Sequence, residues 1–372
     1  KASAITKSPG GFDIGALDKS VDPCVDFYQF ACGGWRQANP IPSDQTRWGR
    51  FNELAERNRE ALREILEQAK DPARRRSPIE AKVGDHYAAC LDESGIEKLG
   101  TKPIEPFLAR VAAVDSKAAL FRLFGENEAL ALPALFRFGA APDMHDSRET
   151  IANVGQGGLG LPDRDDYLKD DPKSKEKRDR YVQHVTRMLE LLGESADQAK
   201  AGAQTVLRIE TALASAHLSR VEMRDPKNRD NPMTVADLQK LAPAFDWSDY
   251  FAATGAPPFS NLNLSSKKYF AESNALLENT PIADWKTYLK WHLVDAAAPH
   301  LGAAFVQEDF SFNRGYLQGA KEIEPRWKRC VQTTDRALGD ALGQLYVEKT
   351  FGPEGKARMG KMIDAITASL RE

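Results

Sequence analysis

The chain has 372 residues, of which 42% are hydrophobic and 28% are charged, and its net charge is −3. This composition is ordinary for a globular protein with enough chain for two or three domains, and the small net charge gives no electrostatic reason to expect nucleic acid or an anionic membrane as a partner. No apolar stretch approaches the ~20 residues that a membrane span needs, and because Lys1 opens a segment without an apolar region, we expect any signal peptide or anchor to be missing from the sequence.

Helical periodicity dominates the chain. Between Arg47 and Lys70, apolar residues recur at helical spacing while charges occupy the other face, which predicts an amphipathic helix. Ser116 and Thr234 are residue types favoured at N-caps, and they predict two further helix starts. Other helices are predicted over residues 79–91, 94–99, 175–192, 196–219, 282–297, 302–317, 326–350 and 354–372. The predicted fold class is therefore mainly α.

Strand signals are confined to one region. Pro133–Phe138 and Glu149–Val154 are short runs flanked by glycine, proline and aspartate. They predict a hairpin whose turn lies within Gly139–Arg148. We expect this small β element, near residues 133–154, to be an exception in a helical protein.

The last predicted helix has a marked apolar face. The residues that share this face are Met359, Met362, Ile363, Ile366 and Leu370. No glycine, asparagine or proline ends the helix before Glu372. The pattern favours a helix that continues beyond Glu372 in a longer polypeptide.

A glycine-rich segment follows the second predicted strand. Gly155–Gly160 satisfies the G-x-G-x-x-G pattern of dinucleotide-binding loops. Such a site requires the last glycine to lead into a helix whose N-terminus holds the pyrophosphate. Leu161–Asp166 follows instead and places three carboxylates where the phosphates would lie, which argues against nucleotide binding.

Metal-binding and catalytic motifs are absent from the sequence. None of the six histidines begins an H-E-x-x-H motif, and there is no recognisable Ser-His-Asp or Cys-His signature. His86 and Cys90 share a helix face, but no second pair has ligand spacing, so we expect a structural role for both. We predict that His217 and His292 are packed core residues. The chain is thus expected to hold neither catalytic residues nor a metal site.

The four cysteines, at positions 24, 32, 90 and 330, allow three pairings, and the residues alone do not choose among them. Four reduced thiols in a cytosolic protein remain an alternative at this point.

Two early segments carry a family resemblance. Asp22–Trp35, with two cysteines and a Gly-Gly-Trp turn, and Arg47–Phe51 closely resemble the start of the ectodomain in the neprilysin and endothelin-converting-enzyme family of zinc metallopeptidases. Later blocks that resemble the family, in the same order, are Tyr87–Glu93, Gly158–Tyr167, Arg224–Pro226, Asn231–Thr234, Arg326–Cys330 and Gly343–Val347. The resemblance covers essentially the whole chain and suggests a bacterial-type member of the family.

The resemblance implies a helical domain that covers an active-site cavity, while the zinc ligands and the general-base glutamate lie in sequence beyond Glu372. It implies that Cys90 pairs with Cys330 and that Cys24 and Cys32 pair with cysteines of that absent part. Disulfides imply in turn an extracytoplasmic location: periplasmic, secreted or surface-anchored.

The resemblance also assigns substrate-binding residues. On residue type alone, Arg47 is an ordinary salt-bridging residue near a helix start. Its position matches a family arginine that contacts the primed end of bound peptides, a role that suits a guanidinium fork. Phe51 and Asn52 belong to the same segment. Asn52 replaces an aspartate of some relatives and Ala55 replaces a second arginine, so a full carboxylate clamp is not expected.

These expectations combine into one hypothesis. Residues 1–46 are a segment that packs on the catalytic part, 47–350 form a helical cap domain that encloses a substrate cavity, and 351–372 begin a connecting helix. The complete protein is expected to be a zinc metalloendopeptidase that hydrolyses peptides, with its zinc bound by the absent C-terminal part, and this chain alone to be inactive. The alternative is a non-catalytic helical module that binds peptides or other partners.

Overall fold

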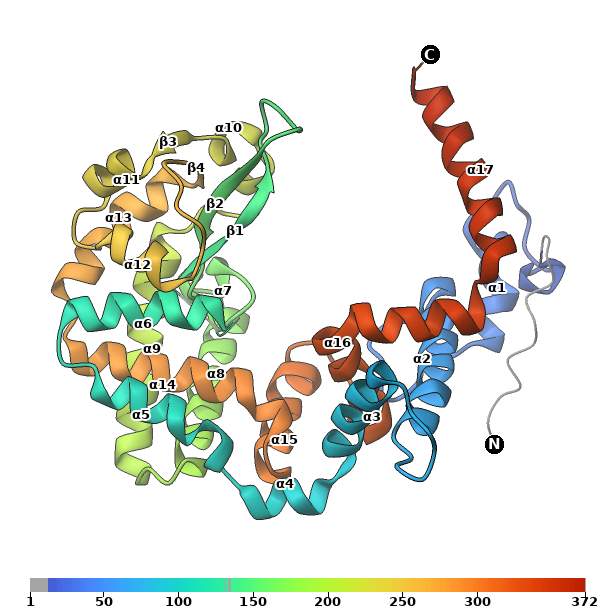
Figure 1. Cartoon of the computed structure of the whole chain (residues 1–372), viewed down its shortest axis with the longest axis horizontal. Coiled ribbons are helices and arrows are strands. Elements are labelled where there is room, and N and C mark those ends of the chain that lie inside the picture. Colours follow the sequence, from blue (N-terminus) through green and yellow to red (C-terminus); the bar gives the residue numbers. More distant parts are fainter. Residues whose placement is uncertain (1–12, 131, 133–134, 372) are drawn as a thin grey trace. The chain divides into compact units, whose positions relative to one another are not determined.

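The computed structural model describes residues 13–130, 132 and 135–371. It is mainly α-helical, with one four-stranded sheet in the residues described, and this confirms the predicted fold class (Figure 1). The chain divides into two compact units: unit 1 comprises Lys1–Ser94 and Asn313–Glu372, and unit 2 comprises Gly95–Phe312. Among the described residues, every helix is either too short or too polar to span a bilayer.

Three helices form the core of unit 1. α2 (Arg50–Ala69), α3 (Pro78–Leu91) and α16 (Arg326–Thr350) pack on one another around a buried apolar cluster (Figure 1). Leu66 on α2 and Val83 on α3 are fully buried there. The apolar face of each of these helices is therefore the face that packs in their shared core. Burying each large aliphatic side chain there contributes about 1.5–3 kcal/mol to the free energy of folding.

A disulfide between Cys90 and Cys330 joins α3 to α16 across a sequence separation of 240. This confirms the pairing that the family resemblance implied. The other elements of unit 1 are the 3-10 turn η1 (Ile14–Ala16), α1 (Phe27–Ala38) and α17 (Gly352–Arg371). α4 (Glu93–Leu99) and the π-helix η5 (Phe310–Tyr316) span the boundaries between the units.

Helix α1 corrects one expectation. The Gly-Gly-Trp sequence that was interpreted as a turn lies inside this helix, which Asp26 caps by accepting a hydrogen bond from the Gln29 amide at 2.9 Å. A Cβ atom on Gly34 would lie 2.6 Å from the carbonyl oxygen of Gly15. Glycine is therefore required for the close approach of η1 to α1, although it weakens the local helical signal.

Helix α2 begins later than its periodicity predicts. Its N-cap is Gly49, in an extended conformation, so the helix starts at Arg50 and not at Arg47. Another predicted helix, over residues 302–317, is α-helical only as α15 (Ala303–Asp309) and continues as the π-helix η5.

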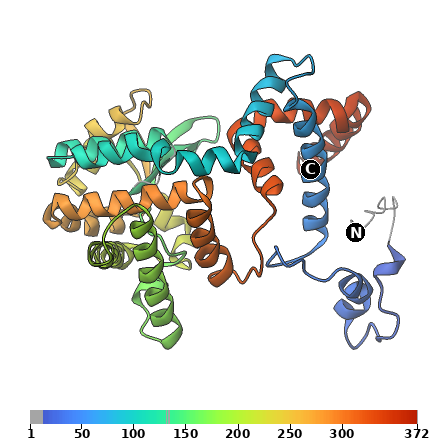
Figure 2. The same cartoon turned by 90° about the horizontal axis from the view of Figure 1, so that it is seen from below.

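Unit 2 surrounds the sheet with helices. Its helical elements are η2 (Lys102–Ile104), α5 (Glu105–Ala113), α6 (Lys117–Ala129), α7 (Arg164–Leu168), α8 (Pro172–Leu191), α9 (Ala196–Ala216), η3 (Glu222–Arg224), α10 (Pro226–Arg229), α11 (Val235–Leu241), α12 (Trp247–Ala253), α13 (Lys267–Asn279), α14 (Ile282–Ala297), η4 (Ala298–His300) and α15. Ser116 and Thr234 cap α6 and α11 as predicted. The teal helix α5 runs beside the orange helix α14 in both views (Figures 1 and 2).

The sheet has the strand order β1-β2-β4-β3, so β1 is an edge strand. Its strands are β1 (Phe136–Pro142), β2 (Thr150–Gln156), β3 (Pro232–Thr234) and β4 (Asn261–Ser265). β1 pairs antiparallel with β2, β2 runs parallel to β4, and β4 pairs antiparallel with β3.

The predicted hairpin is confirmed with shifted ends. Both strands extend further toward the C-terminus than predicted, while Pro133 and Ala134 lie outside the described residues. Neither β3 nor β4 was predicted. β3 has only three residues, and β4 carries a buried polar residue, Asn263, whose amide reaches Asn153 on β2.

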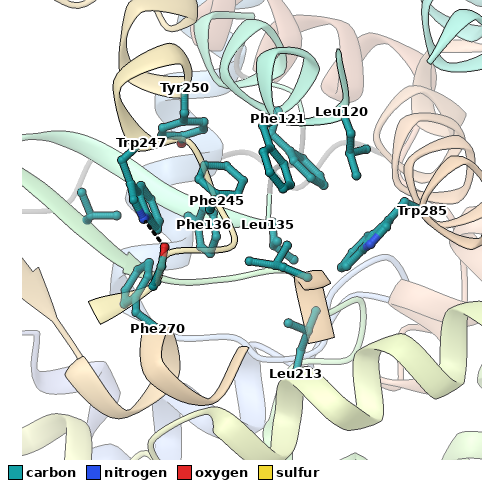
Figure 3. Close-up of a cluster of buried hydrophobic side chains, with 14 of the residues drawn as sticks. Leu120, Phe121, Leu135, Phe136, Leu213, Phe245, Trp247, Tyr250, Phe270 and Trp285 are labelled. Atoms are coloured by element: carbon teal, nitrogen blue, oxygen red, sulfur yellow. Dashed lines mark hydrogen bonds between the residues drawn. The ribbon is translucent and has the colours of Figure 1, made fainter. Parts of the chain in front are cut away.

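An aromatic core anchors β1 to the helices of unit 2 (Figure 3). The ring of Phe136 lies 5.0 Å from that of Trp247, 5.1 Å from that of Phe245 and 5.2 Å from that of Phe270, measured between centroids. The buried indole of Trp247 donates to the carbonyl of Ala242 at 3.1 Å. This packing holds rigidly the strand that forms one wall of a cavity in unit 2.

Candidate functional site

Two regions concern function, one in each unit: the entry to α2, and a cavity beside the sheet. The chain leading into α2 is held firmly. The backbone amides of Lys321 and Glu322 donate to the carbonyl of Ser43, at 3.0 and 3.1 Å. The buried Asp44 carboxylate accepts from Lys328 at 3.1 Å. The segment that follows therefore starts from a fixed position.

Arg50, at the first position of α2, holds the helix in place. Its guanidinium pairs with Asp13 and with Glu53, and it lies over the ring of Trp35, with 5.1 Å to the centroid. The indole of Trp35 also donates to Glu53 at 3.2 Å. This network ties the start of α2 to α1.

The three predicted substrate-binding residues lie at the same helix end. Arg47 is exposed and makes no hydrogen bond or ion pair with any described residue. Phe51 has 87% of its surface exposed. Asn52 is half-buried, and its backbone amide donates to the carbonyl of Gly49 at 2.9 Å. The structure thus brings these residues to one end of α2, and no hydrogen bond links their side chains.

The cavity in unit 2 has a volume of about 1170 Å³. Its walls come from β1, the Gly155–Gly160 loop, α7 and the segment after α9. Its charged lining residues are Arg137, Arg164, Arg220, Arg224, Glu128 and Asp163. None of these was predicted as a site residue, because they are scattered over about 100 positions without a local spacing.

The glycine-rich loop is explained by packing. The carbonyl of Gly157 accepts from His217 at 2.9 Å, and that of Gly158 accepts from the Tyr288 hydroxyl at 2.8 Å. A Cβ atom on Gly160 would lie 2.0 Å from the hydroxyl oxygen of Tyr181. The loop is thus pressed onto aromatic side chains, and only the five-residue helix α7 follows it.

His217 is one of the residues that line this cavity. It is buried, as predicted, and its edge meets Tyr269 with the rings 4.9 Å apart. Burial lowers the pKa of His217 to about 4, and the positive charges of Arg164 and Arg137 act in the same direction, against the carbonyl of Gly157. The imidazole is therefore neutral near pH 7 and donates from Nε2 to Gly157.

A second buried cluster lies behind the loop. The fully buried carboxylate of Glu210 accepts from the hydroxyls of Tyr167 at 2.6 Å and Tyr181 at 3.0 Å. His292, also predicted to be a core residue, is buried with Nε2 2.9 Å from the same carboxylate. Burial raises the pKa of both tyrosines. Because Tyr167 also accepts from the amide of Leu161, the cluster fixes the end of the glycine-rich loop.

The described residues do not fit a zinc site. No group of three or more His, Cys, Asp or Glu side chains gathers there in a way that could hold a metal ion. His86 bonds to Thr334 at 3.0 Å and Cys90 is in the disulfide, so this pair has the structural role predicted. Cys24 and Cys32 are free thiols, exposed and half-buried respectively. Their pairing with cysteines outside this chain stays a prediction.

Comparisons with known proteins give a consistent result. The family model described as peptidase family M13 matches residues 23–372. Endothelin-converting enzyme 1 of Mus musculus and that of Homo sapiens are each 30% identical to the chain over 370 residues, which covers 96% of this chain and 48% of the relative.

Solved structures agree. The Mycobacterium tuberculosis zinc metalloprotease Zmp1, in complex with an inhibitor, superposes with a TM-score of 0.88 at 30% identity, covering 96% of this chain and 54% of Zmp1. PepO from Lactobacillus rhamnosis shares the fold, with a TM-score of 0.77 at 20% identity, over 93% of this chain and 54% of its own. The chain thus spans about half the length of the relatives it matches.

Proposed function

Because the chain belongs to peptidase family M13, we propose that it forms the N-terminal, substrate-enclosing part of a zinc metalloendopeptidase that hydrolyses peptides. The observation that carries the proposal is the match of residues 23–372 to this family together with coverage of about half of each relative. The family resemblance found in the sequence is confirmed. The activity belongs to the complete protein and is our inference.

The catalytic metal has no place among the described residues of this chain. We infer that the zinc of the complete enzyme is held by the C-terminal part that the relatives have in addition. Zinc in such a site would polarise the scissile carbonyl and activate water. This chain would contribute the binding and enclosure of the peptide.

Arg47 is the residue we propose for contact with the primed side of the peptide, with Phe51 and Asn52 beside it. The support is the contrast with Arg50, which is engaged by two carboxylates, whereas Arg47 is exposed and unpaired among the described residues. An unpaired guanidinium can bind a carboxylate or a carbonyl through two parallel hydrogen bonds. The replacements at Asn52 and Ala55 argue against a complete clamp on a free C-terminus.

Exposed apolar residues on α17, and on and just before α1, suggest the partner of this chain. Val25 is 83% exposed and Phe27 is 69% exposed, while Ile363 and Leu370 on α17 are 54% and 81% exposed. Contiguous apolar surface of this kind marks an interaction site. We propose that the C-terminal catalytic part of the same protein covers the exposed apolar residues of both segments. In this proposal residues 1–46 pack on the catalytic part, and residues 351–372 connect to it.

The location we propose is extracytoplasmic. The disulfide between Cys90 and Cys330 supports it, because such bonds persist in oxidising compartments and are rare in the cytosol.

The experiment that tests this proposal determines the reading frame beyond the Glu372 codon and then assays the whole protein for peptide cleavage. The reading frame beyond the Glu372 codon should encode H-E-x-x-H, and the protein made from the whole frame should cleave a fluorogenic peptide. A chelator should abolish cleavage and added zinc should restore it, while a variant with Gln in place of the motif's Glu controls for contaminating proteases. A frame without the motif, or a product without zinc-dependent cleavage, would instead favour a non-catalytic peptide-binding module.

A further inference from the structure

The cavity of unit 2 collects positive charge from four separate elements. Arg137 is on β1, Arg164 on α7, Arg220 in the turn after α9, and Arg224 in η3. They face two carboxylates in the lining, although the chain as a whole carries a net charge of −3. The fold therefore gathers four positive side chains in one cavity, although the net charge of the molecule is negative.

Much of this charge is unused within the described residues. Arg137 and Arg224 are exposed to the cavity and make no hydrogen bond or ion pair with any of those residues. The nearest carboxylate oxygen to Arg164 belongs to Glu222, 3.8 Å from its guanidinium, and its Nε is buried without a hydrogen-bond partner. Arg137 and Arg224 can therefore donate hydrogen bonds to a ligand in the cavity.

The acidic residues of the lining leave Arg137 and Arg224 without an ionic partner among the residues described. Asp163 pairs with Arg220 and caps α7 by accepting from the amide of Asp165 at 2.9 Å. Glu128 accepts from the backbone amide of Phe138, and burial raises its pKa. His217 adds no positive charge near pH 7. The cavity therefore remains electropositive.

We propose that this cavity is a binding site for an acidic segment of a peptide, whose Asp or Glu side chains pair with Arg137 and Arg224. Guanidinium forks bind carboxylates through paired hydrogen bonds. The edge strand β1 carries the small residues Gly139 and Ala140 along the wall, so an extended backbone can approach it. At about 1170 Å³ the cavity has room for several residues. The choice of a peptide as ligand rests on the proposed function.

Binding can be measured without catalysis. The 372-residue chain is titrated against two short fluorescein-labelled peptides, one with an Asp/Glu run and one with Asn/Gln at the same positions. We expect the acidic peptide to bind at least about tenfold more tightly, and rising salt to reduce the difference. The double variant Arg137→Gln/Arg224→Gln should lose about tenfold in affinity for the acidic peptide only.

The matched control is Arg122→Gln/Arg187→Gln, which removes two exposed arginines of unit 2 that lie outside the cavity lining. It should change affinity by less than about twofold, since the net charge changes equally but the site does not. Equal binding of the two peptides, or equal losses in both double variants, would overturn the proposal. So would displacement of the peptide by inorganic phosphate at the same concentration as unlabelled peptide, because the site would then bind any anion.

The failure of this proposal is distinguishable from failure of the peptidase assignment. If the complete protein cleaves peptides with zinc but neither prefers acidic ones nor responds to the cavity variants, the peptidase stands and the acidic-peptide site does not. If the complete protein cleaves nothing and the cavity still selects the acidic peptide, the site stands and the peptidase assignment does not.

Discussion

Two arginines three positions apart at the entry to α2 have different environments. Arg50 is held by Asp13, Glu53 and the face of Trp35, so its removal would disturb the start of the helix. Arg47 has no such partners among the described residues. An exposed, unpaired charge contributes little to folding. Mutation of Arg47 should therefore affect substrate binding, whereas mutation of Arg50 should affect the structure of the helix start.

We therefore expect Arg47→Ala to impair catalysis in the complete enzyme without loss of stability. A hydrogen bond to a charged group contributes about 1.5–3 kcal/mol, so kcat/KM should fall roughly 10- to 150-fold. The loss should be largest for short peptides with a free C-terminal carboxylate and smaller for amidated ones. Arg75→Ala removes the same charge from an exposed loop and should leave kcat/KM unchanged. A large fall in Tm for Arg47→Ala, or equal losses on carboxylate and amide substrates, would mean that Arg47 is structural.

His217 should make the stability of unit 2 depend on pH. Its pKa in the folded protein is about 4, below the ordinary value of 6.5, because the residue is buried. The unfolded chain therefore takes up a proton first as the pH falls, and stability that is fully present above pH ~6.5 is lost as the pH drops toward 4. His184, whose pKa is raised by Asp295 and Glu308 against its burial, acts in the opposite sense and loses its contribution as the pH rises.

The variant His217→Gln separates these contributions, since glutamine can still donate to Gly157 but does not titrate. Between pH 7 and pH 4.5, chemical denaturation should show the parent protein losing roughly 2 kcal/mol more unfolding free energy than the variant. Carboxylates titrate in both proteins and cancel in the difference. Identical losses in parent and variant would contradict the assigned role of His217.

At the scale of elements, the sequence predicted best where one helix face is buried against neighbours. The 326–350 helix was predicted with its observed ends, and α3, α8, α9 and α14 were located within a few residues. α1 was missed because Gly33 and Gly34 look like a turn, whereas in the structure Gly33 makes room for Asp18 and Gly34 for η1. β4 was missed because the side chain of its polar Asn263 donates to Asn153 on β2 and to the carbonyl of Arg229 at the end of α10, which no local pattern reveals.

The two candidate sites also differ in how far the sequence could predict them. Arg47, Phe51 and Asn52 came from one continuous segment that resembles a family, so the sequence could point to them. The arginines of the unit 2 cavity come from four elements and meet only after β1, the glycine-rich loop and η3 are packed together. Their proximity is a property of the tertiary fold and could not be predicted from spacing.

The disulfide between α3 and α16 should be a major source of stability in unit 1. In the chain-entropy model, a loop closed over a separation of 240 residues is worth at most about 5 kcal/mol. Cys90→Ser/Cys330→Ser should therefore lower the unfolding free energy by about 3–5 kcal/mol in denaturant titrations. A non-reduced peptide map of the parent protein should contain the linked pair.

The matched control is Cys24→Ser/Cys32→Ser, which removes the two free thiols and should leave the stability of this chain nearly unchanged. Alkylation of Cys90 in the folded parent protein, or equal stabilities of the two double variants, would argue against a structural disulfide.

At the scale of the whole molecule, the proposal divides one enzyme into a part that encloses the peptide and a part that cleaves it. The described residues of this chain supply arginines that can bind a peptide, in both units, but no cluster for a metal ion. The exposed apolar residues of α1 and α17 are then explained as the surface on which the catalytic part packs.

We expect the isolated 372-residue chain, loaded with zinc, to show no chelator-sensitive cleavage of a fluorogenic peptide and to bind an apolar dye. Ile363 and Ile366 are 54% and 53% exposed on α17, and such a face binds dyes and invites aggregation. Supplying the C-terminal part in trans should restore cleavage and reduce dye fluorescence together, because the same contact covers the face and completes the active site. Ile363→Glu/Ile366→Glu should lower dye binding and prevent this restoration, whereas Thr367→Glu/Ala368→Glu on the same helix should do so much less. A stable, monodisperse chain that binds no dye would refute the packing surface, and chelator-sensitive turnover by the chain alone would refute the division of labour.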